Sequence, residues 1–208
     1  GIARELLTEN TYPGGHPYSW TVIGSMDDLD AANLDDVRKW FTTYYGAANA
    51  VIVVAGDVEP SDVKQRVASH FGDIPSGPPV ARHLAWVAKR TGTHRQTAAD
   101  QVPQARVYKV WNIPQWGTDE SVYLDLVSDV LGLGKASRFY QRLVHREQVA
   151  TSASAAVWLG EISGQFSIVA TAQPDGDLGA VEAALDQELT KFLVDGPTQV
   201  ELDRVKTQ

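Results

Sequence analysis

Two segments of alternating residues, Thr151–Trp158 and Gly164–Ala172, constrain the fold of this chain more than any other feature. Alternation with a period of two indicates half-buried strands. Only five residues separate the two segments, and so short a connection favours antiparallel pairing. The sequence therefore predicts an antiparallel pair of strands in its second half.

Helical patterns surround this pair. Thr198 and Glu201 form a capping box, which predicts that a last helix begins there. The other predicted elements of this half are a strand over residues 105–113 and helices over residues 118–131, 137–148 and 177–194. Strands in series beside runs of helices are typical of an α+β fold. We expect a layered sandwich in which helices pack mainly on one face of a mixed or antiparallel sheet.

The first half predicts a helix–strand–helix unit. Asn33 precedes apolar residues at helical spacing that end at Gly46. The β-branched run Ala50–Ala55 predicts a strand buried on both faces. Ser61 is then expected to cap a helix that ends at Gly72. The residues that follow carry three prolines within residues 75–79 and show no periodicity, which is typical of a linker.

Composition narrows the functional classes. The 18 Lys and Arg residues are outnumbered by 26 Asp and Glu residues, which gives a formal net charge of −8. This is the wrong sign for binding the phosphate backbone, so we expect no nucleic-acid partner. The absence of cysteine excludes disulfides and thiolate zinc sites. No apolar run is long enough for a membrane span.

The ends of the sequence predict a longer protein. The only methionine is Met26, so we expect further residues before Gly1. The helix that begins at Thr198 has no stop signal. We therefore expect the C-terminal boundary to fall inside a helix.

Candidate metal ligands are sparse. No two of the five histidines stand three or four residues apart, the spacing that would place both rings on one helix face. These histidines are His16, His70, His83, His94 and His145. A solvated or helix-terminal position is the favoured interpretation for His70, His83 and His94. The sequence predicts no catalytic, cofactor-binding or metal-binding residue.

Two acidic groups could suggest a cation site but lack the order of a calcium loop. Helix-entry acids explain Asp27, Asp28, Asp30, Asp35 and Asp36 better. A turn and an N-cap account for Asp175 and Asp177.

One glycine-rich segment resembles a phosphate loop. The stretch Gly132–Ser137 fails that motif at two positions, one of which is Ala136 after Lys135. The basic residues of the following helix could meet an anion, although a solvated face is the favoured interpretation. They are Lys135, Arg138, Arg142 and His145 or Arg146.

A series of short motifs carries a family resemblance. In order, these are Tyr-Pro-Gly-Gly-His-Pro-Tyr (12–18), Ile-Gly (23–24), Tyr-Tyr (44–45), Asn-Ala (49–50), Gly-Asp (56–57), Phe-Gly-Asp-Ile-Pro (71–75) and Ser-Arg-Phe-Tyr-Gln-Arg-Leu (137–143). Each motif is weak alone, but their shared order and spacing resemble the insulinase/pitrilysin zinc metallopeptidases. The resemblance covers nearly the whole chain.

The resemblance implies a family-type repeated domain. Residues 1–76 would finish a first peptidase-like domain, residues 77–103 would form a linker, and residues 104–208 would begin a second domain that is truncated in its last helix. The family's zinc motif, His-x-x-Glu-His, would lie upstream of the His-Pro-Tyr segment and does not occur here. The family's substrate-holding Arg and Tyr would fall at Val144 and Thr151, and neither matches. That mismatch favours the zinc-bearing half of the parent, although a parent that never bound zinc is also compatible.

The resemblance therefore implies a non-catalytic part of a zinc-dependent metalloendopeptidase that helps to form the substrate chamber. One alternative is a scaffold or protein-interaction subunit with the peptidase fold and no metal chemistry. Another is an independent enzyme with an unrecognised site. Expected partners are a peptide or unfolded protein substrate, and the missing upstream and downstream domains or a partner subunit. The sequence leaves the compartment open, with export to a bacterial periplasm as the best guess.

Overall fold

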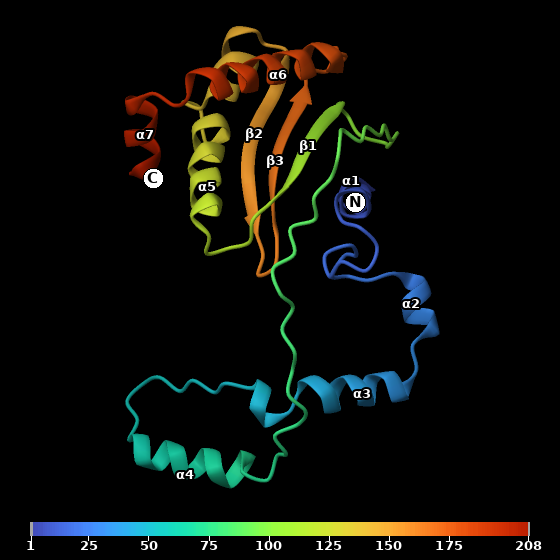
Figure 1. Cartoon of the computed structure of the whole chain (residues 1–208), viewed down its shortest axis with the longest axis vertical. Coiled ribbons are helices and arrows are strands. Elements are labelled where there is room, and N and C mark those ends of the chain that lie inside the picture. The colour runs from blue at the N-terminus through green and yellow to red at the C-terminus, as the bar shows by residue number, and fades with distance from the viewer. Residues whose placement is uncertain (1, 208) are drawn as a thin grey trace. The chain divides into compact units, whose positions relative to one another are not determined.

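The computed structural model describes residues 2–207, which fall into two compact units. One unit contains residues 2–21 and 84–207, and the other contains residues 22–83. Figure 1 traces both along the chain.

A three-stranded antiparallel sheet forms the centre of the larger unit. Its strands are β1 (Arg106–Ile113), β2 (Ala150–Leu159) and β3 (Gly164–Ala172), in the order β1-β3-β2. The register of the β2–β3 pair sets Ala153 opposite Ala170. Both the predicted strand at residues 105–113 and the predicted antiparallel pair are confirmed.

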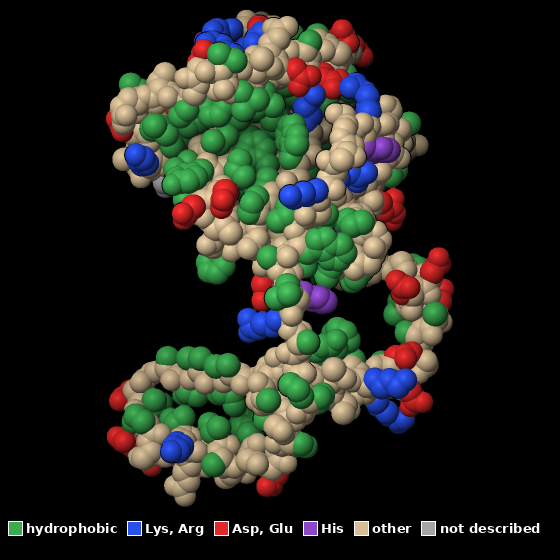
Figure 2. Space-filling model, in the orientation of Figure 1, with side chains coloured by type: hydrophobic (Ala, Val, Ile, Leu, Met, Phe, Trp, Pro, Cys, Tyr) green, Lys and Arg blue, Asp and Glu red, His purple; other side chains and the backbone are tan. Residues whose placement is uncertain are grey.

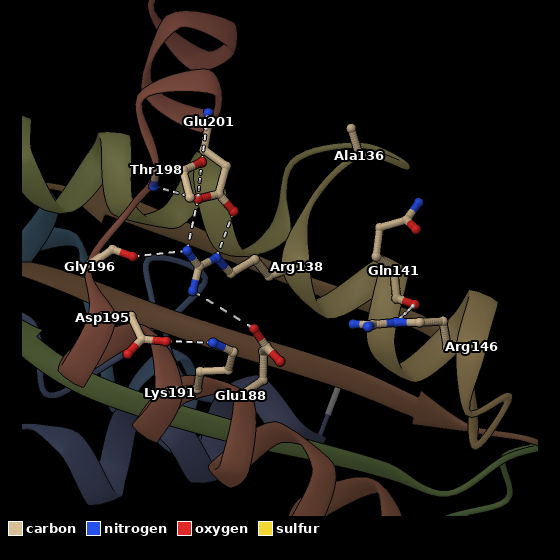
Figure 3. Close-up of a pocket in the computed structure, with 10 residues that line it drawn as sticks. All are labelled: Ala136, Arg138, Gln141, Arg146, Glu188, Lys191, Asp195, Gly196, Thr198 and Glu201. Carbon is tan, nitrogen blue, oxygen red and sulfur yellow. Dashed lines mark hydrogen bonds and ion pairs between the residues drawn. The ribbon is translucent and has the colours of Figure 1, made fainter.

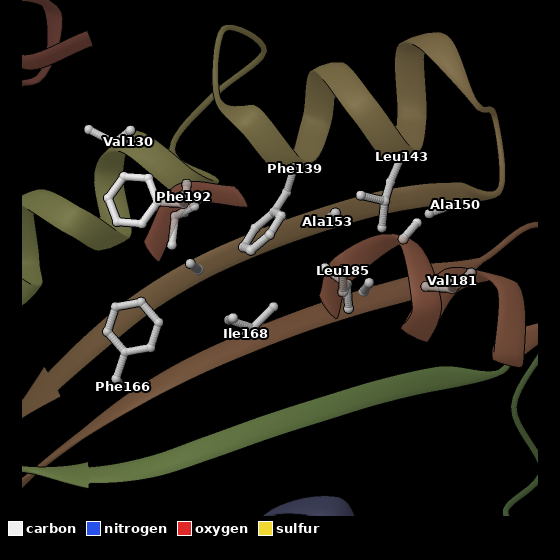
Figure 4. Close-up of a cluster of buried hydrophobic side chains, with 14 of the residues drawn as sticks. Val130, Phe139, Leu143, Ala150, Ala153, Phe166, Ile168, Val181, Leu185 and Phe192 are labelled. Carbon is white, nitrogen blue, oxygen red and sulfur yellow. The ribbon is translucent and has the colours of Figure 1, made fainter. Parts of the chain in front are cut away.

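Helices cover one face of this sheet. They are α5 (Asp119–Gly132), η2 (Tyr140–Arg146) and α6 (Leu178–Asp195). The last helix, α7 (Gln199–Lys206), packs against α5. Phe139, just before η2, and Leu143 of η2 pack with Ile168 of β3 and with Val181 and Leu185 of α6 (Figure 4). Each of these five residues is fully buried, so this layer is the hydrophobic core. The predicted α+β class, with helices mainly on one face, is confirmed.

A short N-terminal helix lies on the opposite face of the sheet. The sequence did not predict this helix, α1 (Ile2–Thr11). The Asn112 side chain of β1 donates to the carbonyl oxygens of Thr11 and Ala88, at 2.6 and 2.9 Å. Its register partner Gln165 donates to the Thr11 hydroxyl at 2.9 Å. These polar contacts from the non-core face attach residues 2–21 to the sheet.

The smaller unit contains α2 (Met26–Ala31), α3 (Leu34–Tyr44), η1 (Ala47–Asn49) and α4 (Pro60–Phe71). The predicted cap at Asn33 is confirmed, because its side chain accepts from the first turn of α3 in a capping box. The predicted cap at Ser61 is wrong, since α4 begins at Pro60 with Glu59 at the N-cap position. Proline suits the first turn of a helix because the amide hydrogen that it lacks would be unpaired there.

The predicted strand at Ala50–Ala55 is not a strand in this structure. A strand needs a neighbouring strand to satisfy its backbone groups. The described sheet lies entirely in the other unit, and residues 22–83 supply no second strand. The β-branched pattern is present, but its pairing partner is not.

The predicted helix at residues 137–148 is shorter than expected, and most of it is a π-helix rather than an α-helix. Residues 140–146 form a π-helix, in which the Glu147 amide donates to the Arg142 carbonyl oxygen five residues earlier. The chain then turns at Gln148, which has a φ of 52°. This left-handed residue ends the helix before β2.

The two compact units have other boundaries than the predicted domains. Residues 2–21 belong with the sheet, and the expected linker 77–103 divides between the two units near residue 83. Part of that linker is attached to the connection between β2 and β3, since the Trp86 amide donates to the Ile162 carbonyl oxygen at 2.8 Å. Contacts alone do not test family domains, so the division at residues 76 and 104 stays a prediction.

Gly132 should be intolerant of a side chain. A Cβ added there would lie 1.8 Å from the backbone nitrogen of Ala155 in β2. We expect Gly132→Ala to lower the free energy of unfolding by about 2–3 kcal/mol, because backbone must move to relieve the collision. Chemical denaturation followed by circular dichroism measures the change. Gly14→Ala is the matched control, because a Cβ at Gly14 meets nothing within 4 Å; equal stability of the two variants would contradict the packing described.

Candidate functional site

An open pocket of about 330 Å³ concentrates ionisable side chains at the junction of η2, α6 and α7. Figure 3 shows the residues that line it, which are Ala136, Arg138, Gln141, Arg146, Glu188, Lys191, Asp195, Gly196, Thr198 and Glu201. The predicted glycine-rich segment and the basic helix that follows it supply one wall. Helix α6 and the beginning of α7 supply the other.

Arg138 is the central residue of this pocket. Its guanidinium binds the Glu201 carboxylate in a bidentate manner, with Nε–Oε1 at 2.7 Å and Nη2–Oε2 at 2.8 Å. The same Nη2 donates to the Gly196 carbonyl oxygen at 2.9 Å. The guanidinium also lies 5.0 Å from the centre of the Phe192 ring. Arg138 therefore joins the segment before η2 to both ends of the α6–α7 connection.

Arg142 makes a second set of ion pairs one turn further along. Its Nε donates to Glu147 at 2.7 Å, and its Nη1 lies 3.5 Å from the buried carboxylate of Glu188. Only 12% of the Arg138 side chain and 18% of the Arg142 side chain are exposed. The solvated-face interpretation is wrong for these two residues, because the anions they meet are carboxylates of the protein itself.

The ion pair perturbs the acidity of its carboxylate. The hydrogen bonds from Arg138 lower the pKa of Glu201 from 4.5 to about 2, while partial burial opposes them and bonds from Thr198 assist. Thr198 belongs to the predicted capping box, which is confirmed. Glu201 thus both caps α7 and holds Arg138.

The other cationic side chains of this pocket also have partners within the protein. Lys191 pairs with Asp195 at 2.5 Å, and Arg146 donates to the Gln141 carbonyl oxygen at 3.2 Å. Because each of these cations already contacts an acceptor of the protein, an incoming anion would have to displace internal contacts. The geometry is that of a structural clamp between η2 and the α6–α7 connection.

His16 occupies a second, buried polar site in the larger unit. Its side chain is fully buried, its Nδ1 accepts from the Tyr18 amide at 3.0 Å, and its Nε2 lies 2.8 Å from the Trp86 carbonyl oxygen. A carbonyl oxygen only accepts, so Nε2 carries the proton. The ring stacks on Tyr12 with 4.5 Å between centroids. Both nitrogens are therefore occupied by protein partners, which makes His16 a structural residue.

Sequence reasoning assigned His16 only to a motif and missed this role. The available signal was the aromatic flanking of the histidine by Tyr12 and Tyr18. The partner Trp86 lies 70 residues away and could not be paired from spacing.

The remaining histidines are scattered. His70 lies in the last turn of α4, as predicted, and His145 lies on η2. His83 and His94 are exposed in segments without regular structure. Across residues 2–207, no cluster of three or more His, Cys, Asp or Glu side chains could hold a metal ion.

The acidic groups lie where the helix-entry interpretation put them. Asp27 and Asp28 are in the first turn of α2, and Asp35 and Asp36 are in the first turn of α3. The Asp177 carboxylate caps α6 by accepting from the Gly179 amide at 2.8 Å. The helix-entry interpretation is confirmed for these four residues but is wrong for Asp30, which lies in the last turn of α2. The N-cap interpretation of Asp177 is confirmed.

Val144 and Thr151, the two positions where the family's substrate-holding Arg and Tyr would fall, have structural contacts, and the helices were also compared with the length of a membrane span. Val144 of η2 packs against the core, and the Thr151 hydroxyl donates to the Thr171 carbonyl oxygen at 3.4 Å. Of the helices described between residues 2 and 207, none has the length and apolar character that a bilayer span requires.

Comparison with known proteins relates the chain to one family. Residues 31–208 match the family model described as the peptidase M16 inactive domain. The zinc protease PqqE of Helicobacter pylori is 29% identical over 194 residues, which cover 92% of this chain and 44% of that protein. An uncharacterized zinc protease of Bacillus subtilis, YmxG, is 25% identical over 214 residues and 49% of its length. The chain thus spans about half the length of these relatives.

Solved structures agree with this relationship. The crystal structure of a protease from Helicobacter pylori superposes with a TM-score of 0.81 at 28% identity, covering 100% of this chain and 51% of that one. A peptidase M16 inactive domain from Pseudomonas fluorescens gives a TM-score of 0.76 at 20% identity over 99% of this chain and 49% of that chain. The second likeness is one of fold alone.

The Arg138–Glu201 pair should make the free energy of unfolding depend on pH. The native pKa of Glu201 lies below its ordinary value, so the pair stabilises the fold above about pH 4.5 and loses that effect as pH falls towards 2. We expect Glu201→Gln to cost about 1–2 kcal/mol at pH 7, because solvent still screens part of the interaction. Denaturation between pH 2 and 7 should show a flatter pH dependence in the variant. Glu120→Gln changes the same charge at an exposed residue of α5; a variant profile no flatter than that of this control would contradict the clamp.

Replacing His16 should destabilise the larger unit. His16→Ala removes two hydrogen bonds and a stacked ring from a fully buried position. We expect a loss of about 2–4 kcal/mol in the free energy of unfolding. Thermal and chemical denaturation should be compared with His94→Ala, a change at an exposed histidine. If both variants are as stable as the unmodified chain, the structural role of His16 is wrong.

Proposed function

Because this chain belongs to the peptidase M16 inactive-domain family, we propose that it is a non-catalytic part of a zinc-dependent metalloendopeptidase and helps to form its substrate chamber. The observation that carries the proposal is the 29% identity to a zinc protease across 92% of the chain. The YmxG relative, matched over 100% of the chain, is also called a zinc protease.

The geometry of the two polar sites supports a non-catalytic role. Glu201 and Glu147 are engaged by arginines, and both ring nitrogens of His16 contact backbone. A zinc ligand needs a free lone pair, and a general base needs access to substrate. We place the zinc and its His-x-x-Glu-His ligands in a part of the protein outside residues 1–208.

The proposed division into domains gains support from burial. None of residues 22–83 is buried, although this stretch contains large apolar side chains. A domain needs a core of its own. We propose that residues 1–76 complete a first domain whose remainder is encoded upstream, and that residues 104–208 begin a second domain after the linker 77–103.

The proposed partners are a peptide or unfolded protein substrate and the remaining domains or a partner subunit. Export to the periplasm is proposed for a bacterial parent, since a fold neighbour at a TM-score of 0.68 is the periplasmic protease PqqL of Escherichia coli. Cell fractionation tests this location, and recovery of the protein only in the cytoplasm would contradict it.

The full-length protein provides the test. We expect about one zinc ion per chain by elemental analysis, and cleavage of an unfolded protein such as casein that a chelator stops and added zinc restores. Residues 1–208 alone are the matched control and should bind no zinc and cleave nothing. A metal-free, inactive full-length protein would instead support the scaffold alternative, whereas cleavage by residues 1–208 alone would show an independent enzyme.

Cross-linking tests the chamber separately. A photoreactive peptide bound to a catalytically inactive full-length variant should cross-link to residues within 1–208, mapped by mass spectrometry. Cross-links confined to other parts of the protein would contradict a chamber role for this chain.

A further inference from the structure

His16 belongs to a closed circuit of hydrogen bonds that joins three distant segments of the larger unit. Its Nε2 donates to the Trp86 carbonyl oxygen at 2.8 Å, and the Trp86 amide donates to the Ile162 carbonyl oxygen at 2.8 Å. The Ile162 amide donates to the Tyr18 hydroxyl oxygen at 3.4 Å, and the Tyr18 amide donates to Nδ1 of His16 at 3.0 Å. Each of these four residues therefore holds the next one, and we call them the His16 circuit.

The His16 circuit lies close to both points where the chain passes between the two units. The larger unit contains residues up to Thr21 and resumes at Leu84. Tyr18 precedes the first of these boundaries by three residues, and Trp86 follows the second by two. Both segments are bound to Ile162, in the connection between β2 and β3. The circuit therefore fixes, within the larger unit, the two segments that lead to residues 22–83.

Histidine is the only side chain of this circuit that takes up a proton in mild acid. The phenols of Tyr12 and Tyr18 face the imidazole ring, and tyrosine phenols are uncharged in acid. Burial raises the pKa of the Tyr12 phenol further. Strands β2 and β3 contain no charged residue. The charged residues of the other segments packed around the circuit are Arg4, Glu5 and Glu9 of α1, Lys89 and Arg90 after Trp86, Arg106 and Lys109 of β1, and Glu161 of the β2–β3 connection.

A proton on Nδ1 of His16 is incompatible with the circuit. Both ring nitrogens meet backbone groups, and Nδ1 is the one that accepts, from the Tyr18 amide. After protonation, two N–H donors would face each other, and the positive charge would lie in a fully buried position with no carboxylate on either nitrogen. A histidine that is buried in its neutral form must leave its site before it can become charged. Acid therefore favours the open form of the circuit.

We propose that His16 is an acid-sensitive clasp, in which uptake of one proton opens the circuit and frees the two segments that lead to residues 22–83. The clasp is closed at neutral pH and opens as the pH falls. Release is local, because the amide side chain of Asn112 still binds the carbonyl oxygens of Thr11 and Ala88 and does not titrate. This inference does not depend on the proposed function.

Hydrogen exchange of the full-length protein tests the clasp. A released histidine takes up its proton near pH 6.5, so opening should become about 10-fold more favourable between pH 7.5 and pH 5.5. Peptides that cover residues 12–21 and 84–91 should lose protection by this factor, after correction for the intrinsic effect of pH on exchange. Peptides from β2 and β3 should keep their protection over the same range.

A pair of histidine substitutions assigns the effect to one ring. His16→Gln keeps an N–H donor for the Trp86 carbonyl oxygen and cannot titrate, so the protection of the two peptides should change by less than about 2-fold between the same pH values. The histidine side chains visible on the surface in Figure 2 belong to other positions, because His16 is fully buried. His94→Gln, which replaces an exposed histidine, is the matched control and should retain the 10-fold response.

Nitrogen NMR of the unmodified full-length protein, labelled at histidine, gives a readout that does not depend on the folding of a variant. The His16 ring should be neutral with its proton on Nε2 at pH 7.5, and its protonation should accompany the loss of protection. Three results would each overturn the proposal. These are equal protection of the two peptides at both pH values, a 10-fold loss that persists in His16→Gln, and a protonated His16 ring while both peptides remain protected.

Discussion

The larger unit depends on the pairing of β3 with a strand on each side. Its register with β1 and β2 places Ile168, Ala170 and Ala172 on the face that the helices cover, where all three are fully buried. Small residues on β2, such as Ala153 and Ala155, let the helical layer come close. The near contact between Gly132 and the β2 backbone follows from the same requirement. The helices are thus positioned by the sheet.

Ion pairs then fix the order of the helical layer. Arg138 holds the α6–α7 connection through Glu201 and Gly196, and Lys109 of β1 reaches Glu182 of α6 at 3.1 Å. Hydrogen bonds from Arg95 and Lys109 lower the pKa of Glu182 to about 2. Partly buried cations with bound carboxylates are a costly arrangement unless the geometry is good. Here the bidentate contacts supply that geometry, and the charges serve the fold rather than a ligand.

In the smaller unit, the predicted helices form, but the predicted strand does not, because it has no neighbouring strand to pair with. Its helices form, because caps such as Asn33 and backbone hydrogen bonds within each helix are local. Its apolar strand pattern does not form a strand, because a sheet satisfies its backbone only through other segments.

The sequence by itself determined the elements whose interactions are local or nearly so. These include the capped helices α3, α5 and α7, the β2–β3 pair joined by a short connection, and the family motifs in their order. Only the tertiary structure decided that His16 contacts Trp86, that Arg138 binds Glu201 and that α1 lies on the sheet. Each of these contacts joins residues 63 to 101 positions apart. Periodicity and capping report on neighbours within a few residues, whereas distant pairs are chosen by packing and burial of the whole unit.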